Sequence, residues 1–321
     1  MQSFESVLRE EQPRINAVIQ NEIAGMPELV QPVASHSLNA GGKRLRPMLT
    51  VFMGRLFGVT HPDLYTLAAA IEFFHVATLI HDDVLDNAPT RRGNPAAHAV
   101  YEPKHAILGG DAMLAHAARM VARIGNPRIV QQFAEGVVQT ATGEIEEFMH
   151  LGNIALPHET YLKIITGKTA WSLRCSCEIP AIYAKCSEEK LRAAATFGLE
   201  LGLAFQMVDD ALDIAPSEHT GKPSGGDLRE RKCTPLNQLY WLSLPQQEAE
   251  AFAECFAEGA FTDDEIAATI DAMRAKGLDT KVRDMAAVHL ARAEEALVCL
   301  PGGAARDLLA QVPEFIRSRG N

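Results

Sequence analysis

Apolar residues recur every three or four positions along almost the whole chain, which places them on one face of an α-helix. Strict alternation of apolar and polar residues, which would indicate half-buried strands, is scarce. The pattern therefore predicts an all-α protein. The expected helices lie near residues 3–22, 27–38, 43–56, 62–86, 105–124, 127–150, 158–183, 188–214, 234–243, 246–257, 263–275, 278–299 and 303–318.

Clusters of glycine and proline separate the predicted helices at residues 41–42, 93–95, 125–127 and 221–226. None of these clusters has the low-complexity composition of an interdomain linker. A chain of 321 residues allows one large domain or two smaller ones. We expect a single domain, residues 1–321, in which long helices form a bundle around a deep central cavity.

The same acidic pattern ends two of the most apolar predicted helices. Residues 82–86 read Asp-Asp-Val-Leu-Asp, and residues 209–213 read Asp-Asp-Ala-Leu-Asp. In each copy the first and last aspartates are four residues apart, so they share a helix face and repel each other. A hard divalent cation removes that repulsion, and Mg²⁺ prefers carboxylate oxygens together with substrate phosphates. An ordinary acidic cap is disfavoured because carboxylates destabilise a helix C-terminus.

Basic residues follow both acidic motifs in the sequence. Arg91 and Arg92 come directly after the first motif, and the planar guanidinium group suits phosphate oxygens. Lys222 and Lys232 stand in the glycine-rich stretch after the second motif. That stretch is equally consistent with a flexible surface loop that carries scattered lysines.

A separate basic turn precedes the helix expected at residues 43–56. Residues 41–47 read Gly-Gly-Lys-Arg-Leu-Arg-Pro. The two glycines allow a ligand to approach the backbone closely, and Lys43 and Arg46 share a face at a helix N-terminus, which favours anions. Basic turns are also common at protein surfaces, so this segment alone is only moderately specific for an anion site.

Between the acidic motifs, Lys168 and Thr169 interrupt an apolar helix. A single lysine in a helix usually lies at the surface, and Lys168 is a candidate only because the other motifs accompany it. Glu144, Glu146 and Glu147, next to Gly143, either support the site residues from behind or form an ordinary exposed helix face, and we favour the exposed face.

Composition narrows the class of protein. The formal net charge is −11, which argues against a general nucleic-acid surface because phosphate binding requires clustered Lys and Arg. The six cysteines show no CxxC pair or zinc-ligand spacing, and we expect reduced thiols in the cytoplasm. The N-terminus lacks a signal-peptide pattern. No run of about 20 residues is free of charge, so we expect no transmembrane segment.

In this order the motifs resemble those of the trans-isoprenyl diphosphate synthases, the polyprenyl synthetase family. The matching segments are residues 41–47, residues 82–86 with Arg91-Arg92-Gly93, residues 110–114 (Gly-Asp-Ala-Met-Leu), Lys168-Thr169, and Phe205-Gln206 with residues 209–213. Together they are highly specific, and the likeness is strongest over residues 41–232. It implies an isoprenoid-synthase-type bundle, a homodimer, and Mg²⁺-dependent, head-to-tail condensation of isopentenyl diphosphate with an allylic diphosphate.

The resemblance also implies a role for each matching residue. The Mg²⁺ partners are Asp82, Asp86, Asp209 and Asp213. The expected catalytic residues are these four aspartates, the second aspartate of each motif, which we call the inner aspartate (Asp83 and Asp210), and Lys168. The residues expected to hold the allylic diphosphate are Arg91, Lys168, Thr169, Gln206, Lys222 and Lys232. Those expected to hold isopentenyl diphosphate are Gly42, Lys43, Arg46, His75 and Arg92.

The chain departs from the family pattern in the loop after the second acidic motif. Arg231 stands where the family often has glycine, and Thr234-Pro235-Leu236 replaces the more usual Thr-Leu-Pro. These departures affect the expected loop geometry and the role of Lys232, whereas the acidic motifs match.

Residues just before the first acidic motif are expected to set the product length. Ala77 and Thr78 lie about one helical turn before Asp82, and Phe74 lies about two turns before it. Short-chain members of the family place an aromatic residue near positions 77 and 78, so small residues there predict elongation beyond farnesyl diphosphate. If Phe74 is the floor of the cavity, the product is geranylgeranyl diphosphate or moderately longer. If Phe74 packs away from the cavity, the product is long, such as octaprenyl diphosphate.

Two alternative functions remain open. The first alternative is a non-catalytic or partner-dependent subunit of a heteromeric prenyl synthase. The second is a class I terpene cyclase. Such subunits usually lack one or both acidic motifs, and a cyclase does not need Lys43, Arg46 and His75. A structural protein without a ligand would leave the acidic helix ends and their arginines unexplained.

Overall fold

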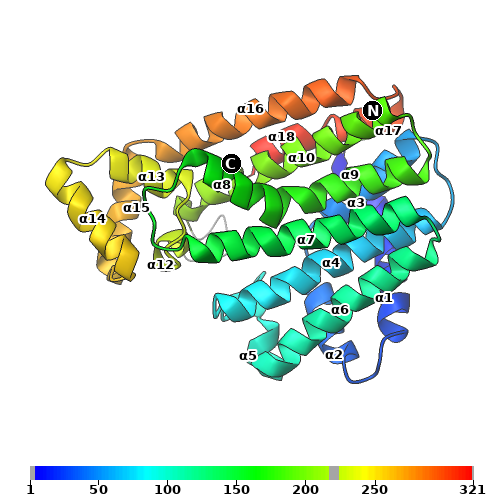
Figure 1. The fold of residues 1–321 in the computed structure, drawn as a ribbon, viewed down its shortest axis with the longest axis horizontal. Coiled ribbons are helices and arrows are strands. Elements are labelled where there is room, and N and C mark those ends of the chain that lie inside the picture. Colours follow the sequence, from blue (N-terminus) through cyan, green and yellow to red (C-terminus); the bar gives the residue numbers. More distant parts are fainter. Residues whose placement is uncertain (1–3, 217–223, 320–321) are drawn as a thin grey trace. The chain divides into compact units, whose positions relative to one another are not determined.

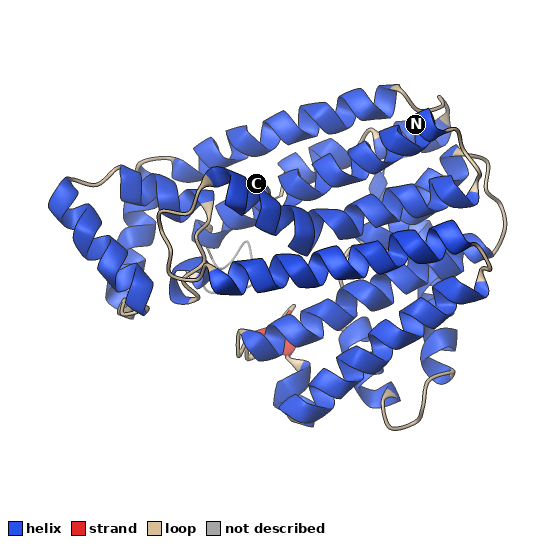
Figure 2. Cartoon of the chain, viewed as in Figure 1, coloured by secondary structure: helices blue, strands red, loops and turns tan. Residues whose placement is uncertain are grey.

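The computed structural model describes residues 4–216 and 224–319. In this part of the chain almost all regular structure is helical, and the one sheet is a two-stranded hairpin (Figure 2). The predicted all-α fold is confirmed. Contacts divide the chain into two compact units, and we describe each separately. Unit 1 comprises Met1–Val138, Ser172–Gly198 and Glu295–Val312, and unit 2 comprises Gln139–Trp171, Leu199–Glu294 and Pro313–Asn321.

Unit 1 is organised around α4 (Asp63–Leu85), which packs most extensively against α6 (Pro103–Arg123) and α3 (Leu45–Leu56). Because neighbours surround α4, it buries apolar side chains on several sides, among them Phe73 and Phe74. The remaining elements of unit 1, labelled in Figure 1 where there is room, are α1 (Phe4–Ala24), α2 (Gln31–Asn39), β1 (Thr90–Arg91), β2 (Asn94–Pro95), α5 (Ala97–Tyr101) and α17 (Ala304–Leu309).

By length and composition α4 is also the one helix among the described residues that could cross a membrane, and 67% of its most apolar window is buried inside the protein. Core helices of globular folds meet the same criterion, so the finding is weak evidence for a membrane span.

A buried ion pair fixes the start of α3. Arg44 has a left-handed backbone conformation, with φ of 51°. Its Nη1 donates to Oε1 of Glu72 on α4 at 2.6 Å, and its Nη2 donates to the carbonyl oxygen of Leu38. The two charged side chains are 4% and 3% exposed. Buried charges persist only when they are paired, so this pair ties the basic turn of residues 41–47 to α4.

In unit 2, α8 (His158–Ile165) continues into one turn of π-helix, η1 (Thr166–Ala170). The helix packing beside this turn requires glycine, because a Cβ at Gly143 would lie 2.3 Å from the backbone nitrogen of Lys168. The elements confined to unit 2 are completed by η2 (Leu212–Ile214), α12 (Gly226–Arg229), α13 (Pro235–Leu242), α14 (Gln246–Glu258) and α15 (Asp263–Ala275). Helices with residues in both units are α7 (Pro127–Met149), α9 (Trp171–Tyr183), α10 (Glu188–Ala211), α16 (Leu278–Val298) and α18 (Val312–Arg317).

The predicted helices are confirmed, and the differences are local. The helix expected at 158–183 contains the π turn of η1, and the helix expected at 303–318 is divided into α17 and α18. The hairpin β1–β2 and the short helices α5 and α12 were not predicted, because each is too short to show a periodicity. A single domain stays a prediction.

Candidate active site

The first acidic motif lies at the C-terminal end of α4, and its three aspartates differ in environment. Asp82 and Asp86 are half-buried, and Asp86 caps the helix by donating its N–H to the carbonyl oxygen of Asp82 at 2.8 Å. Asp83 is only 4% exposed, and its Oδ1 accepts a hydrogen bond from Nε of Arg91 at 2.7 Å and another from Nη2. The inner aspartate is therefore neutralised by the chain itself.

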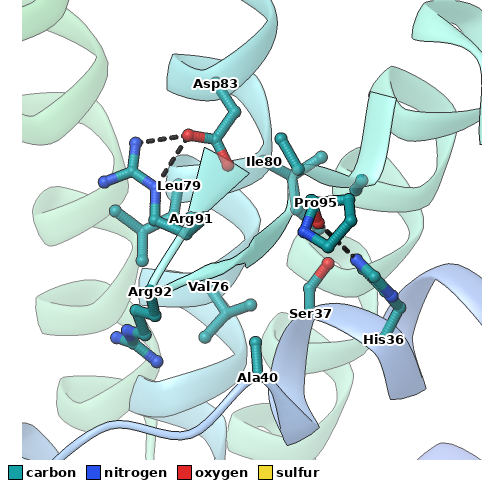
Figure 3. Close-up of a pocket in the computed structure, with 12 residues that line it drawn as sticks. His36, Ser37, Ala40, Val76, Leu79, Ile80, Asp83, Arg91, Arg92 and Pro95 are labelled. Atoms are coloured by element: carbon teal, nitrogen blue, oxygen red, sulfur yellow. Dashed lines mark hydrogen bonds and ion pairs between the residues drawn. The ribbon is translucent and has the colours of Figure 1, made fainter. Parts of the chain in front are cut away.

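The hairpin that carries Arg91 and Arg92 is fixed to two helices (Figure 3). Arg92 and Gly93 form its two-residue loop with φ of 53° and 76°, as hairpin turns with two left-handed residues require. Arg91 ties the hairpin to α4 through Asp83, and Nε2 of His36 on α2 donates to the carbonyl oxygen of Pro95 at 2.8 Å. Behind the hairpin lies a cavity of about 20 Å³, which has room for about one water molecule and none for a diphosphate.

The glycine turn before α3 lies against the guanidinium group of Arg92. Nη1 of Arg92 donates to the carbonyl oxygen of Gly41. A Cβ at Gly42 would lie 2.6 Å from Nη1, and Gly42 has φ of +120°. The backbone conformation at position 42 therefore favours glycine, and a side chain there would also displace the guanidinium group of Arg92. The sequence predicted a close approach there, and in this structure the approaching group is a side chain of the expected anion site.

Arg46 and His75 face each other in unit 1. Nη1 of Arg46 lies 3.1 Å from Nε2 of His75, and its Nε donates to Oγ of Ser172 at 2.7 Å. Burial lowers the pKa of His75 well below its usual value, and the positive charges of Arg46, Arg92, Arg91 and Arg44 lower it further. His75 is therefore neutral, and its Nε2 accepts the hydrogen bond from Arg46. Unit 1 thus brings together Gly42, Arg46, His75, Arg91 and Arg92, whereas Lys43 is exposed.

The second acidic motif ends α10, and its inner aspartate is also buried. Asp210 is 5% exposed. Its Oδ2 accepts from the hydroxyl of Tyr161 at 2.6 Å, and its Oδ1 accepts from Nε2 of Gln206 at 2.8 Å. The hydroxyl of Thr169 donates to Oε1 of Gln206 at 2.7 Å. Thr169 and Gln206, which were expected to hold the allylic diphosphate, thus belong to one hydrogen-bonded chain.

The outer aspartates of the second motif have different partners. Asp209 is exposed, and its Oδ1 accepts from Nη2 of Arg319 at 3.1 Å. Asp213 accepts from the backbone N–H of Gly226 at 2.9 Å and from that of Asp227 at 3.3 Å. The backbone at Gly226 and Asp227 therefore lies against the acidic motif. Lys222 lies outside the described residues.

Burial and mutual repulsion make this carboxylate cluster costly to ionise. Burial is the main cause that raises the pKa of Asp210 to about 7 and that of Asp213 to about 6, and it raises the pKa of Asp227 well above its usual value. In the described part of the chain, Oδ2 of Asp227 is buried without a hydrogen-bond partner. A divalent cation supplies the positive charge that such a donor set lacks, so the residues fit Mg²⁺. Among the described residues, no three His, Cys, Asp or Glu side chains are already arranged around one ion position.

Two lysines share a glutamate beside the π turn. Nζ of Lys168 pairs with Glu144 at 2.8 Å and also with Glu147. Nζ of Lys232 lies 2.5 Å from Glu230 and 3.8 Å from Glu147. The interpretation of the glutamates as an exposed face is wrong for Glu144 and Glu147, whose side chains are 22% and 19% exposed. The π turn presents Lys168 to α7, and π turns are frequent at functional sites.

Three residues of the second motif's surroundings were missed by sequence reasoning. Asp227 had a signal, since it stands in the glycine-rich stretch that was singled out for its lysines. Tyr161 stands seven residues before Lys168 in the sequence, which is the spacing of two turns of an ideal α-helix, but nothing in the sequence links it to the second motif. Arg319 had no sequence signal, because its contact with Asp209 joins residues 110 positions apart.

Phe74 and Ala77 point into the interior of unit 1. Each is 1% exposed. The ring of Phe74 meets that of Phe133 edge to face, with centroids 5.6 Å apart. Thr78 is half-buried, and its hydroxyl donates to the carbonyl oxygen of His75 at 2.8 Å. Phe74 is therefore one of two contacting aromatic rings in the interior of unit 1.

Known proteins support the interpretation of these motifs as those of the polyprenyl synthetase family. The family model for polyprenyl synthetase matches residues 27–273. The chain is 34% identical to heptaprenyl diphosphate synthase component 2 of Geobacillus stearothermophilus, over 95% of this chain and 93% of that protein. It is 33% identical to nonaprenyl diphosphate synthase of Mycobacterium tuberculosis, over 98% and 94%.

A solved structure agrees. Polyprenyl synthase from Caulobacter crescentus, complexed with calcium and isoprenyl diphosphate, has a TM-score of 0.94 and 32% identity to this chain, with 99% of this chain and 97% of that one covered. The resemblance found in the sequence is thereby confirmed. The chain belongs to the polyprenyl synthetase family, and it is a trans-prenyltransferase.

Proposed function

We propose that this enzyme condenses isopentenyl diphosphate with an allylic diphosphate, head to tail, and that it uses Mg²⁺. The main observation behind the proposal is that each unit gathers a different kind of charged group. Unit 1 gathers arginines around a neutral His75, and unit 2 crowds buried carboxylates beside Lys168. The relatives named heptaprenyl and nonaprenyl diphosphate synthase favour an all-trans product longer than geranylgeranyl diphosphate.

The residues of unit 1 suit isopentenyl diphosphate. Arg46 and Arg92 present guanidinium groups to an anion beside the glycine turn. Because Nε2 of His75 accepts from Arg46, the imidazole proton lies on Nδ1, where it is a donor rather than an acid. In this proposal Gly42 and Lys43 complete the diphosphate contacts.

The residues around both acidic motifs suit the allylic diphosphate. Asp82, Asp86, Asp209 and Asp213 would hold Mg²⁺, which when bound neutralises charge that develops on the departing diphosphate. Arg91 in unit 1, and Lys168 and Lys232 in unit 2, would each donate to phosphate oxygens. In unit 2, Thr169 and Gln206 would add polar contacts. The allylic C–O bond breaks, the alkene of isopentenyl diphosphate attacks the carbocation, and the released diphosphate takes the proton. Apolar walls keep water from the cation.

The cellular setting is proposed on simpler grounds. All six cysteines are free thiols, which suits a reducing compartment. We therefore place the enzyme in the cytoplasm. The formal net charge of −11 is the ground for expecting no nucleic-acid partner.

Chain elongation by the purified protein is the direct test. Incubation with isopentenyl diphosphate, farnesyl diphosphate and Mg²⁺ should give geranylgeranyl or longer products, and chelation of Mg²⁺ should abolish them. Asp82→Asn should lower the rate by about a hundredfold or more, as loss of transition-state charge stabilisation does. Asp63→Asn, at the opposite end of α4, removes a carboxylate of the same type and should retain the rate.

Absence of elongation by the lone protein would contradict the proposal and favour a partner-dependent subunit or a terpene cyclase. The subunit has one observation in its favour, because a relative carries the name component 2. Cyclic hydrocarbon products would identify a cyclase.

We also propose a homodimer. In unit 1 large apolar side chains are exposed on α6 and α7, where Leu108 is 62% exposed and Val138 is 55% exposed. Such a surface favours burial against a second copy. Light scattering after gel filtration should give twice the mass of the chain, and Leu108→Glu should shift the mass toward the monomer. Val288→Glu changes a comparably exposed side chain on α16 (52%) and should leave the mass unchanged. A monomeric wild-type protein would contradict the proposal.

For product length we propose that Phe74, supported by Phe133, is the floor of the tail cavity. Phe74→Ala should then lengthen the products with little loss of rate, because it removes one of the two rings. Phe73→Ala is the matched control, since Phe73 stacks on His116 instead (centroids 5.4 Å apart). Ala77→Phe should shorten the products. Product sizing by reversed-phase chromatography checks each variant, and an unchanged distribution for Phe74→Ala would place the floor elsewhere.

The neutral state of His75 predicts a pH effect on stability. Below about pH 6.5 the unfolded chain protonates this histidine, whereas the folded protein does not. The unfolded state then binds more protons, so the free energy of unfolding falls as the pH decreases from 7 to 5. His75→Gln should show a shallower fall over this range in urea titrations at fixed pH. Equal pH dependence in both proteins would mean that His75 is protonated in the folded state.

A further inference from the structure

The last described residue of the chain is fixed in place by α16. After α18 the N–H of Arg319 donates to the carbonyl oxygen of Ile316 at 3.3 Å. The guanidinium group of Arg283 donates to the carbonyl oxygens of Arg317 and Arg319 at 3.3 and 2.9 Å. The backbone position of Arg319 is therefore set by Arg283, which lies in the part of α16 that belongs to unit 2, independently of what the side chain of Arg319 contacts.

The side chain of Arg319 lies on the second acidic motif. Its Nη2 donates to Oδ1 of Asp209 at 3.1 Å, and its Cζ lies 4.2 Å from the centroid of the Phe205 ring. Phe205 is four residues before Asp209, so both lie on one face of α10. A cation over an aromatic face is attracted to it. The guanidinium group is thus held by a carboxylate and a ring, and the side chain is 22% exposed.

Within residues 4–216 and 224–319, one nitrogen of the same guanidinium group lacks an acceptor. Nη1 of Arg319 is buried and has no hydrogen-bond partner in the part of the chain that the structure describes. An unsatisfied buried donor is unfavourable, more so when it is charged. A phosphate oxygen is the type of acceptor that a guanidinium edge suits best.

We propose that Arg319 is a further residue of the diphosphate site and makes cation binding at Asp209 conditional on a diphosphate. This inference rests on the proposed function. A divalent cation that arrives alone must displace or repel the positive charge of Arg319 at Asp209. A cation that arrives with a diphosphate brings negative charge, which attracts Arg319 and supplies an acceptor for Nη1. Arg319 therefore couples the two ligands, and the coupling acts equally in both directions.

Calorimetric titration of the full chain tests this without an activity assay. Mg²⁺ is titrated into the protein alone and into the protein saturated with inorganic pyrophosphate. Arg319→Ala should bind Mg²⁺ alone about three- to tenfold more tightly than the wild type, since a nearby positive charge is removed. With pyrophosphate present, the variant should bind Mg²⁺ no more tightly than the wild type. The dissociation constant for Mg²⁺ alone, divided by that measured with pyrophosphate, should therefore be smaller in Arg319→Ala than in the wild type.

Arg317→Ala is the matched control, because it removes the same charge two residues earlier. Arg317 pairs with Glu314 and Glu294 instead of the acidic motif, so its loss should leave both constants unchanged. Arg283→Gln retains Arg319 but removes its backbone anchor, and it should shift the constants in the same direction by a smaller factor.

The outcomes separate this inference from the proposed function. If the wild type binds Mg²⁺ with pyrophosphate and Arg319→Ala has the same constants, the inference is overturned and the proposed function stands. Equal effects of Arg319→Ala and Arg317→Ala would mean that only the net charge of the protein changes Mg²⁺ binding, and this outcome would also overturn the inference. A wild-type protein that binds neither ligand overturns the proposed function, and the inference with it.

Discussion

Carboxylates at the ends of apolar helices must be balanced by positive charge or by hydrogen-bond donors, and the surroundings of both acidic motifs follow from that constraint. In each motif the inner aspartate is buried and satisfied by the chain itself, as Asp83 is by Arg91 and Asp210 is by Tyr161 and Gln206. The outer aspartates are more accessible. One sequence pattern thus supplies two functions, because the inner residue positions the local structure and the outer residues remain within reach of a ligand.

The arginines of unit 1 also combine a structural role with a role at the expected anion site. Arg91 holds the hairpin to α4, and the adjacent Arg92 lies on the glycine turn before α3. Arg44 is buried against Glu72 and fixes that turn. All four arginines around His75 therefore have partners in the protein, since Arg46 donates to Ser172, and their charge still lowers the pKa of His75. Arginines that form structural ion pairs, Arg44 and Arg91, therefore also contribute positive charge at the expected anion site.

Long periodic helices could be predicted from the sequence because tertiary packing required the same apolar stripe that the pattern displays. The π turn could not, since its five residues are too few to show a periodicity of their own, yet it lies where Lys168 contacts α7. Glu144 and Glu147 were misread because a glutamate on a helix face gives no sign of a lysine that approaches from a later helix. The acidic motifs and the glycine turn were recognisable because their residues are adjacent in the sequence. Tyr161 and Arg319 were not, because their contacts with the second motif join distant positions.

The two motifs look alike in sequence but differ in the charge of the groups that hold them. The inner partner of the first motif is a cation, Arg91, which cancels one negative charge directly. The inner partners of the second motif are a hydroxyl and an amide, which are neutral, and Asp227 adds a further carboxylate nearby. The chain therefore supplies less positive charge to offset the ionised second motif, and burial makes its ionisation costly, as the raised pKa values of Asp210 and Asp213 indicate. It should depend more strongly than the first on cations from elsewhere, which explains why a distant residue such as Arg319 is found there.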